Sequence, residues 1–153
     1  MNREAITEAF FDEYCVAAAD QIVEWSSAAL APRRSIVERL TGTLAVAGLV
    51  AILQCLCARE LERRLKTYDE MPVAMQIHCE PHAPVVEGAR MRMTGWVESA
   101  DDRGVTFRVK AQDEQEQICD GRIRFALVPR AENMQTLERK REAIMRREMF
   151  TPA

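Results

Sequence analysis

The sequence predicts an α+β fold in which one long apolar helix is wrapped by an antiparallel sheet. Residues 44–65 form a largely apolar run without proline, and this run ends in charged residues. After Pro72 the hydrophobic period changes from about 3.6 to about 2, and four short segments with this alternation follow one another. The stretches between them are short and carry turn residues, so neighbouring strands are predicted to run antiparallel.

The part of the chain before the helix is the least regular. Residues 10–16 (FFDEYCV) combine aromatic residues with a β-branched end and are typical of a strand, although the flanking alanines favour a helix equally well. Residues 31–35 are predicted to be a linker, after which Ser35 caps a short helical turn through Leu40. A strand at 10–16 would raise the number of strands in the sheet to five.

The central helix is predicted from Leu44 to Leu65. Its first half is apolar on all sides and its second half is charged on one face, so we expect it to be buried first and to reach the surface later. The apolar run ends at Cys57 and contains Gln54, which makes it shorter than the ~18–20 residues that cross a bilayer. We therefore expect a core helix and no membrane partner.

The four segments after Pro72 are predicted as strands with one buried and one polar face. The residues predicted to be buried are Val73, Met75, Ile77 and Cys79; Met91, Met93 and Val97; Val105, Phe107, Val109 and Ala111; and Ile123, Phe125 and Leu127. Pro129 ends the last strand. A charged helix is predicted at 133–149, inside a C-terminal extension at 130–150.

These elements have one economical arrangement, in which the sheet curls around the helix, and this is a hot-dog fold. We predict a single domain over residues 1–153 with its core at about 10–128. Such a sheet leaves an edge strand exposed, and pairing that edge with a second copy would cover it. The expected assembly is a homodimer, or a tetramer built from two such dimers.

Composition limits the partners and the compartment. The formal net charge of -3 argues against a nucleic-acid partner attracted by bulk electrostatics. The five cysteines are odd in number and include no CxxC pair, and the N-terminus lacks a secretory pattern. We therefore expect a cytoplasmic protein with free thiols that act mainly as small hydrophobic groups.

Residues Leu44 to Gln54 (LAVAGLVAILQ) and Val73 to Gly88 (VAMQIHCEPHAPVVEG) resemble the hot-dog thioesterase family that includes fluoroacetyl-CoA thioesterase. The resemblance extends from about Phe10 to Val128. In that family a threonine opens the central helix, a glutamate follows two turns later, and a histidine lies after the next strand.

Carried over residue by residue, the resemblance puts the family histidine at His82, the threonine at Val46 and the glutamate at Gln54. A register through Thr41 or Thr43 does not restore the glutamate, since Leu49 or Ala51 then occupies its position. The chain thus departs from the family pattern at two of three catalytic positions.

The chemistry that the resemblance implies is thioester hydrolysis, which needs an activated water and donors for the developing oxyanion. We assign His82 as base or acid, and Gln54 as a group that orients water or polarises the carbonyl. Backbone amides around Ala47 and Gly48 are candidate oxyanion donors because a helix N-terminus has free N–H groups. Val46 would shape the pocket, and Gly88 is a candidate substrate contact.

Each of these residues also has a structural interpretation. Gln54 is equally well explained as a core amide with a backbone or partner-subunit hydrogen bond, and His82 as a loop histidine without a role. Gly88 is explained by a turn. His78, Cys79 and Glu80 lie near His82 in sequence, but Pro81 interrupts the spacing and no distant ligand pair is evident, so we expect no metal.

Two functions remain open. The first is an acyl-CoA or acyl-carrier thioesterase. The alternative is a hot-dog module that binds an acyl ligand without turnover. A dehydratase is less favoured than either, because the helix lacks the Asp and His pair that such an enzyme uses. We expect no cofactor other than coenzyme A as part of the substrate. The basic runs at 139–141 and 146–147 are candidate contacts for its phosphates, although a solvated helix face explains them more simply. Arg122 and Arg124 on the last strand are alternative phosphate contacts.

Overall fold

The computed structural model describes residues 3–17, 43–44, 46–86 and 88–150. The predicted linker at 31–35 and the turn capped by Ser35 lie outside these residues. In chain order the elements are α1 (Arg3–Thr7), β1 (Phe10–Val16), β2 (Thr43–Leu44), α4 (Val46–Arg64), β3 (Glu70–Pro81), β4 (Val85–Val86), β5 (Arg90–Asp101), β6 (Gly104–Gln112), β7 (Gln117–Pro129) and α5 (Arg130–Phe150).

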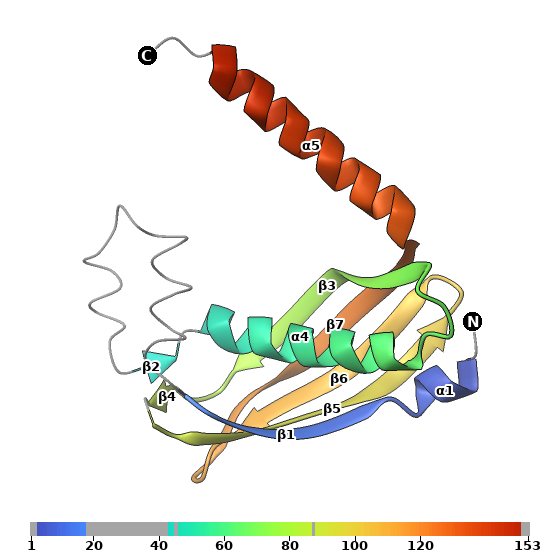
Figure 1. The fold of residues 1–153 in the computed structure, drawn as a ribbon. Coiled ribbons are helices and arrows are strands. Elements are labelled where there is room, and N and C mark those ends of the chain that lie inside the picture. Colours follow the sequence, from blue (N-terminus) through green and yellow to red (C-terminus); the bar gives the residue numbers. More distant parts are fainter. Residues whose placement is uncertain (1–2, 18–42, 45, 87, 151–153) are drawn as a thin grey trace.

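A five-stranded antiparallel sheet curves around α4, as Figure 1 shows. Its strand order is β1-β5-β6-β7-β3, so β1 and β3 are the edges. The segment at 10–16, for which the sequence allowed either a strand or a helix, is the edge strand β1 and pairs with β5. The predicted α+β arrangement of a helix wrapped by a sheet is confirmed.

The helix α4 is buried along one stripe. Leu49, Leu53, Cys57 and Leu61 are almost fully inaccessible and recur every four residues, which sets them above one another on one helix face. Cys55, on another face, is exposed. The predicted burial of the first half therefore holds for this stripe and not for Cys55, because the sheet covers only one side of the helix.

The second half of α4 is tied to the edge of the sheet by ion pairs. Glu60 is 5% exposed and accepts hydrogen bonds from Arg63 at 2.7 Å and Arg64 at 3.3 Å. Arg59 donates to Glu13 of β1 at 2.6 Å. A buried carboxylate needs such partners, so this network sets how α4 lies against β1.

In the first half of the edge strand β3, the buried side chains differ from those predicted. Met75 has no partner in the ladder with β7 and forms a bulge, which shifts the alternation of side chains. Ala74, paired with the buried Phe125, packs against the core, whereas Val73 was expected to do so. Met75 is 63% and Ile77 45% exposed, which contradicts the prediction that both are buried. An edge strand lies partly beyond the cover of the helix, and this explains their exposure.

The short strands β2 and β4 join two distant parts of the chain. Thr43 pairs with Val86, and Leu44 pairs with Val85. The helix therefore begins at Val46 rather than at the predicted Leu44, because Leu44 belongs to this ladder. As a result the start of α4 lies beside the segment that follows β3, at one end of the molecule (Figure 1).

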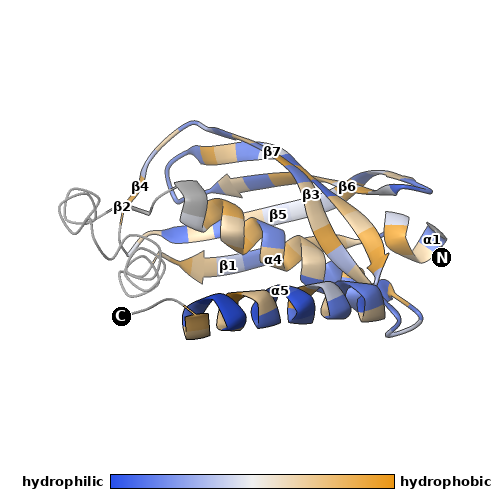
Figure 2. Ribbon diagram, turned by 90° about the horizontal axis from the view of Figure 1, so that it is seen from above, coloured by the Kyte–Doolittle hydropathy of each residue, from blue (hydrophilic) through white to orange (hydrophobic). Residues whose placement is uncertain are grey.

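The C-terminal helix α5 follows β7 directly and is longer at both ends than the predicted 133–149. Its first residue is held by the loop before β3: the Arg130 amide donates to the Asp69 carbonyl at 2.6 Å, and the guanidinium lies 4.2 Å from the centre of the Tyr68 ring. Beyond this anchor α5 rises away from the domain (Figure 1), and blue hydrophilic residues cover much of it (Figure 2).

Candidate active site

His82 lies one residue beyond β3, in the segment where the sequence predicted the histidine. Its backbone N–H donates to the Ile118 carbonyl at 2.7 Å, which continues the ladder between β3 and β7 past Pro81. The side chain is exposed. The backbone at His82 is thus fixed by a strand ladder, while its ring is open to a ligand.

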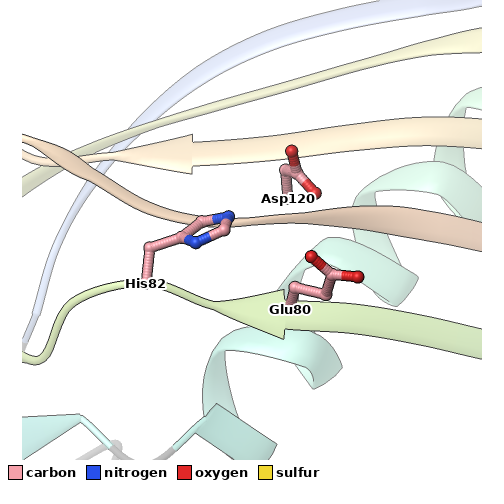
Figure 3. A group of neighbouring side chains, drawn as sticks. All are labelled: Glu80, His82 and Asp120. Carbon is pink, nitrogen blue, oxygen red and sulfur yellow. The ribbon is translucent and has the colours of Figure 1, made fainter.

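Two carboxylates lie beside the ring of His82 (Figure 3). A ring nitrogen of His82 and one carboxylate oxygen each from Glu80 and Asp120 all lie within 4.8 Å of one another. Glu80 lies on β3, two residues before His82, and is the direct ladder partner of Asp120 on β7. We call these three residues the acid–imidazole cluster.

Other polar side chains hold the two carboxylates of this cluster. Asp120 accepts from Arg108 at 3.3 Å and from Gln117 at 3.5 Å. Glu80 lies 3.3 Å from the ring of His78. These contacts moderate the repulsion that two facing carboxylates would otherwise have.

The cluster lies on the face of the sheet that points away from α4. Arg108, whose side chain donates to Asp120, lies between the fully buried Phe107 and Val109 on β6. Because these two neighbours face the core, Arg108 faces the other side of the sheet. Gln54 is half-buried on α4, across the sheet, and within the described residues no hydrogen bond joins it to His82. A single chain therefore does not bring these two predicted site residues together. That Gln54 and His82 meet across a seam between two subunits stays a prediction.

The other predicted site residues lie near the start of α4. Val46, Ala47 and Gly48 form its first turn, where backbone N–H groups lack partners within the helix. Gly88 has a φ of 86°, and its N–H donates to the Ala17 carbonyl at 2.7 Å. The turn interpretation therefore accounts for Gly88, because this backbone conformation favours glycine.

The donor set of the cluster is of a kind that divalent metals accept, since zinc and manganese bind imidazole and carboxylate groups. However, both carboxylates already have side-chain partners, and the ligand atoms of Glu80 and His82 are exposed. Exposed acidic groups of this kind are common in proteins without a metal. We therefore interpret the cluster through its acid–base chemistry.

The cysteines in the core are poor nucleophiles. Burial raises the pKa of the Cys57 thiol far above its usual range and raises that of Cys119 to about 11. A thiol with a raised pKa carries little thiolate at neutral pH. This supports the interpretation of both residues as small hydrophobic groups.

Four of the arginines considered for coenzyme A phosphates are engaged in ion pairs. Arg122 forms a two-point contact with Glu98 at 2.6 and 2.8 Å, and this contact holds the pKa of that carboxyl below its usual value. Arg124 contacts Asp101 at 3.0 Å. Two arginines of α5 pair with acids of the same helix, as expected for a solvated face: Arg141 with Glu138 and Arg146 with Glu142.

An open hollow lies at the same end of the sheet as His82, near the edge strand β1. It is lined by Tyr14, Arg90, Arg92, Gln112, Asp113 and Glu114. Arg92 is held there by Asp12 through two hydrogen bonds of 2.8 and 2.7 Å. Basic and acidic groups both line the hollow, so its charge does not select an anionic ligand.

A central helix wrapped by a sheet of order β1-β5-β6-β7-β3 defines a hot-dog protein, and solved structures support this class. The structure of a fluoroacetyl-CoA thioesterase matches with a TM-score of 0.75 and 18% identity, over 88% of this chain and 96% of that chain. A hot-dog-like protein from Thermanaerovibrio acidaminovorans matches with a TM-score of 0.73 and 16% identity over both full chains. A thioesterase superfamily member from Thermus thermophilus matches at 0.70 and 16%, over 92% and 96%.

The sequence itself assigns the family. Residues 27–131 match the model of the fluoroacetyl-CoA-specific thioesterase family, and the chain belongs to that family. No curated protein matches the chain significantly. Among the described helices, none has the length and apolar run needed to cross a bilayer.

Sequence reasoning missed Asp120. It lies between the buried Cys119 and Gly121 in a strand whose polar positions were assigned to a solvated face. Its proximity to His82 depends on the register between β3 and β7, and the local sequence pattern does not predict that register. Glu80 was considered only as a neighbour in a metal pattern.

Proposed function

We propose that this protein hydrolyses the thioester bond of an acyl-CoA or acyl-carrier substrate, with His82 as the group that transfers protons. The observation that carries the proposal is the family match over residues 27–131, combined with a histidine after the strand that follows the helix. Two acidic side chains beside that histidine support the same chemistry.

The proposed reaction is a direct attack by water. His82 accepts a proton from the water as its oxygen bonds to the thioester carbonyl carbon, and the carbonyl oxygen gains a negative charge. Amides of the first turn of α4, around Ala47 and Gly48, are the proposed donors to that oxygen. When the tetrahedral centre collapses, the C–S bond breaks and His82 returns the proton to the leaving thiolate.

The acid–imidazole cluster compensates in this proposal for the missing helix glutamate. A carboxylate beside an imidazole orients the ring and stabilises the imidazolium that forms during the reaction. Asp120 is the proposed positioning residue, because its own contact with Arg108 holds it in place. Gln54 keeps its proposed role of orienting the water or polarising the carbonyl, and this role requires the helix of a second subunit to approach His82.

We further propose a homodimer in the cytoplasm. The free edge of β3 and its exposed Met75 and Ile77 support pairing with a second copy, as does the face of α4 that the sheet leaves open. Variants of the fluoroacetyl-CoA thioesterase have been crystallised with fluoroacetate and CoA and with acetyl-CoA. By analogy we expect coenzyme A to enter as part of the substrate, with Val46 shaping the acyl pocket and Gly88 lying near it.

One observation favours the alternative of binding without turnover. The positions of the family threonine and glutamate are occupied by Val46 and Gln54, and neither side chain can attack the carbonyl or remove a proton. A protein that had lost turnover would still bind the acyl thioester.

The test is a panel of acyl-CoA substrates, including fluoroacetyl-CoA and acetyl-CoA, with release of free thiol followed over time. His82→Ala should reduce turnover at least ~100-fold, the scale of general acid–base catalysis. The comparison variant is His78→Ala, which removes the other histidine; it contacts Glu80 rather than His82, so its loss should reduce turnover much less than His82→Ala does.

Each result of the panel decides between the functions. Saturable binding of acyl-CoA without thiol release, with turnover appearing only in Gln54→Glu, would favour the binding module. Equal loss in both histidine variants would contradict the role of His82.

A further inference from the structure

The C-terminal helix α5 has few contacts with the rest of the chain that the structure describes. It contains 21 residues, and none of them is buried against the part of the chain that the structure describes. The contacts near its start involve Arg130 and also Asn133, whose amide lies 3.2 Å from the sulfur of Met71. The rest of the helix extends into solvent (Figure 1).

This exposed helix nevertheless carries an apolar stripe. Four of its apolar residues lie on one side at helical spacing and are roughly half exposed: Met134 49%, Leu137 40%, Ile144 51% and Met145 52%. Glu138 and Arg141 lie within the same stripe and contact each other at 3.4 Å.

Local interactions are too weak to explain a helix of this length. A helix without tertiary packing is marginal in water, and each ion pair along it contributes only about 0.2–0.5 kcal/mol. The pairs Glu138–Arg141 and Glu142–Arg146 are of this weak kind. Burial of the apolar stripe against another helix would supply the missing stabilisation.

We propose that α5 pairs with α5 of a second copy of this chain in an antiparallel arrangement. If the two-fold axis passes between Arg139 and Lys140, Met134 of one copy faces Met145 of the other, and Glu138 faces Arg141. Each contact then occurs twice, as a two-fold interface requires. The stripe is therefore complementary to itself in both shape and charge.

Charge also selects the direction and the partner. In a parallel pair Glu138 would face Glu138 and Arg141 would face Arg141, and such like-charge contacts are unfavourable. The helix carries six basic and four acidic residues, and the acidic residues are interleaved with the basic ones. This pattern suits a second α5 better than an anionic membrane, which would favour a polar face of basic residues.

The pairing is compatible with the exposed edge of β3. The helix starts at the end of β7, beside the start of β3. A two-fold axis across a seam between two β3 strands reverses every direction perpendicular to it, and two α5 helices that lie across this axis run in opposite directions. The pair would thus extend the proposed dimer beyond its strands.

Disulfide trapping tests the arrangement directly. Met134→Cys and Met145→Cys are prepared separately in a Cys55→Ser background, because Cys55 is the exposed natural cysteine. After mild oxidation of the mixture we expect a covalent dimer, whereas either variant alone should give only the background of the parent. These two positions lie three turns apart on one helix and cannot cross-link within it. Absence of the mixed dimer, or cross-linking of Met134→Cys with itself, would overturn the proposal.

Self-association gives an independent readout. By analytical ultracentrifugation we expect Met145→Glu to raise the dissociation constant of the wild-type assembly at least ~10-fold, since it puts a charge into the apolar stripe. Ala143→Glu adds the same charge on the opposite side of the same helix and is expected to change the constant less than about two-fold. Equal effects of the two substitutions, or a monomeric wild type, would contradict the pairing.

These outcomes are separate from those of the thioesterase proposal. The α5 pairing concerns assembly and holds whether or not the protein releases thiol from acyl-CoA. A variant that loses α5 pairing but retains turnover would support the inference and leave the catalytic proposal unaffected.

Discussion

Glu80 of β3 and Asp120 of β7 are direct partners in the strand ladder, and the ring of His82 lies beside both carboxylates. Two like charges facing each other across a sheet are unfavourable unless cations or donors lie close. Arg108 and His78 supply these contacts. The arrangement thus puts two carboxylates beside an exposed histidine.

The positioning role of Asp120 predicts a specific kinetic change. Asp120→Asn removes the charge beside His82 but keeps the shape, and we expect kcat for thiol release to fall about 10–100-fold. The KM for the acyl-CoA should change less than about two-fold, since Asp120 is proposed to act through His82 rather than to bind the substrate. Steady-state kinetics separates the two constants, with Glu80→Gln for comparison. An unchanged kcat, or a rise in KM alone, would remove Asp120 from the mechanism.

Gly121 next to Asp120 is predicted to be intolerant of a side chain. A Cβ at this position would collide with the backbone carbonyl of His78 and with Cys79 on the neighbouring strand. We expect Gly121→Ala to lower the free energy of unfolding by about 2–3 kcal/mol, because backbone atoms in a ladder cannot move aside easily. Urea unfolding measures the change.

Gly95 provides the comparison for this prediction. A Cβ there would meet the ring of Phe11 on the edge strand β1, which is a side chain rather than backbone. Gly95→Ala should therefore cost less than Gly121→Ala. The reverse order would show that the ladder between β3 and β7 yields more easily than the packing of Phe11.

The thiols are predicted to react in a fixed order. Cys55 is exposed on α4, whereas Cys57 and Cys119 are buried and have raised pKa values. With an aromatic disulfide reagent at pH 8 we expect Cys55 to be modified first, and Cys57 and Cys119 only when the protein unfolds. Mass spectrometry of the labelled peptides identifies the order. If the proposed dimer covers Cys55, its modification will slow as the protein concentration rises.

Acid is predicted to destabilise the outer face of the sheet. The hydrogen bond from Arg92 holds the pKa of Asp12 below its usual value, and that from Arg122 does the same for Glu98. A carboxyl with a lowered pKa contributes stability that is present above its unfolded value, about 4, and is lost as the pH falls through the folded value. Urea midpoints measured from pH 7 to pH 3 should therefore decline below about pH 4.5. The double variant Asp12→Asn and Glu98→Gln should flatten this decline, and an equally steep decline would assign it to other groups.

The prediction from sequence succeeded where local pattern determines structure. The apolar run before Arg59 predicted α4, and the change of period after Pro72 predicted the strands, because helices and strands repeat with different periods. It failed at Met75, where a bulge shifts the alternation, and at Cys55, where only one side of the helix meets a sheet. A bulge and one-sided cover are tertiary events without a signature in the local alternation.

The site divides in the same way. The resemblance assigned His82, and the structure has it at the end of a strand ladder, with the amides of the α4 start on the same end of the molecule. The resemblance could not reveal Asp120, which reaches His82 only through the register of β3 against β7. Whether Gln54 meets His82 depends on a second subunit.

The sequence by itself determined the helix, the strands, the turns between them and the membership of a family, since each of these follows from residue spacing or motif. Only the tertiary structure decided which strands form the edges, which carboxylates surround His82 and how much of α5 remains uncovered. Those features arise from contacts between residues far apart in the chain, and a pattern of neighbouring residues carries no record of such contacts.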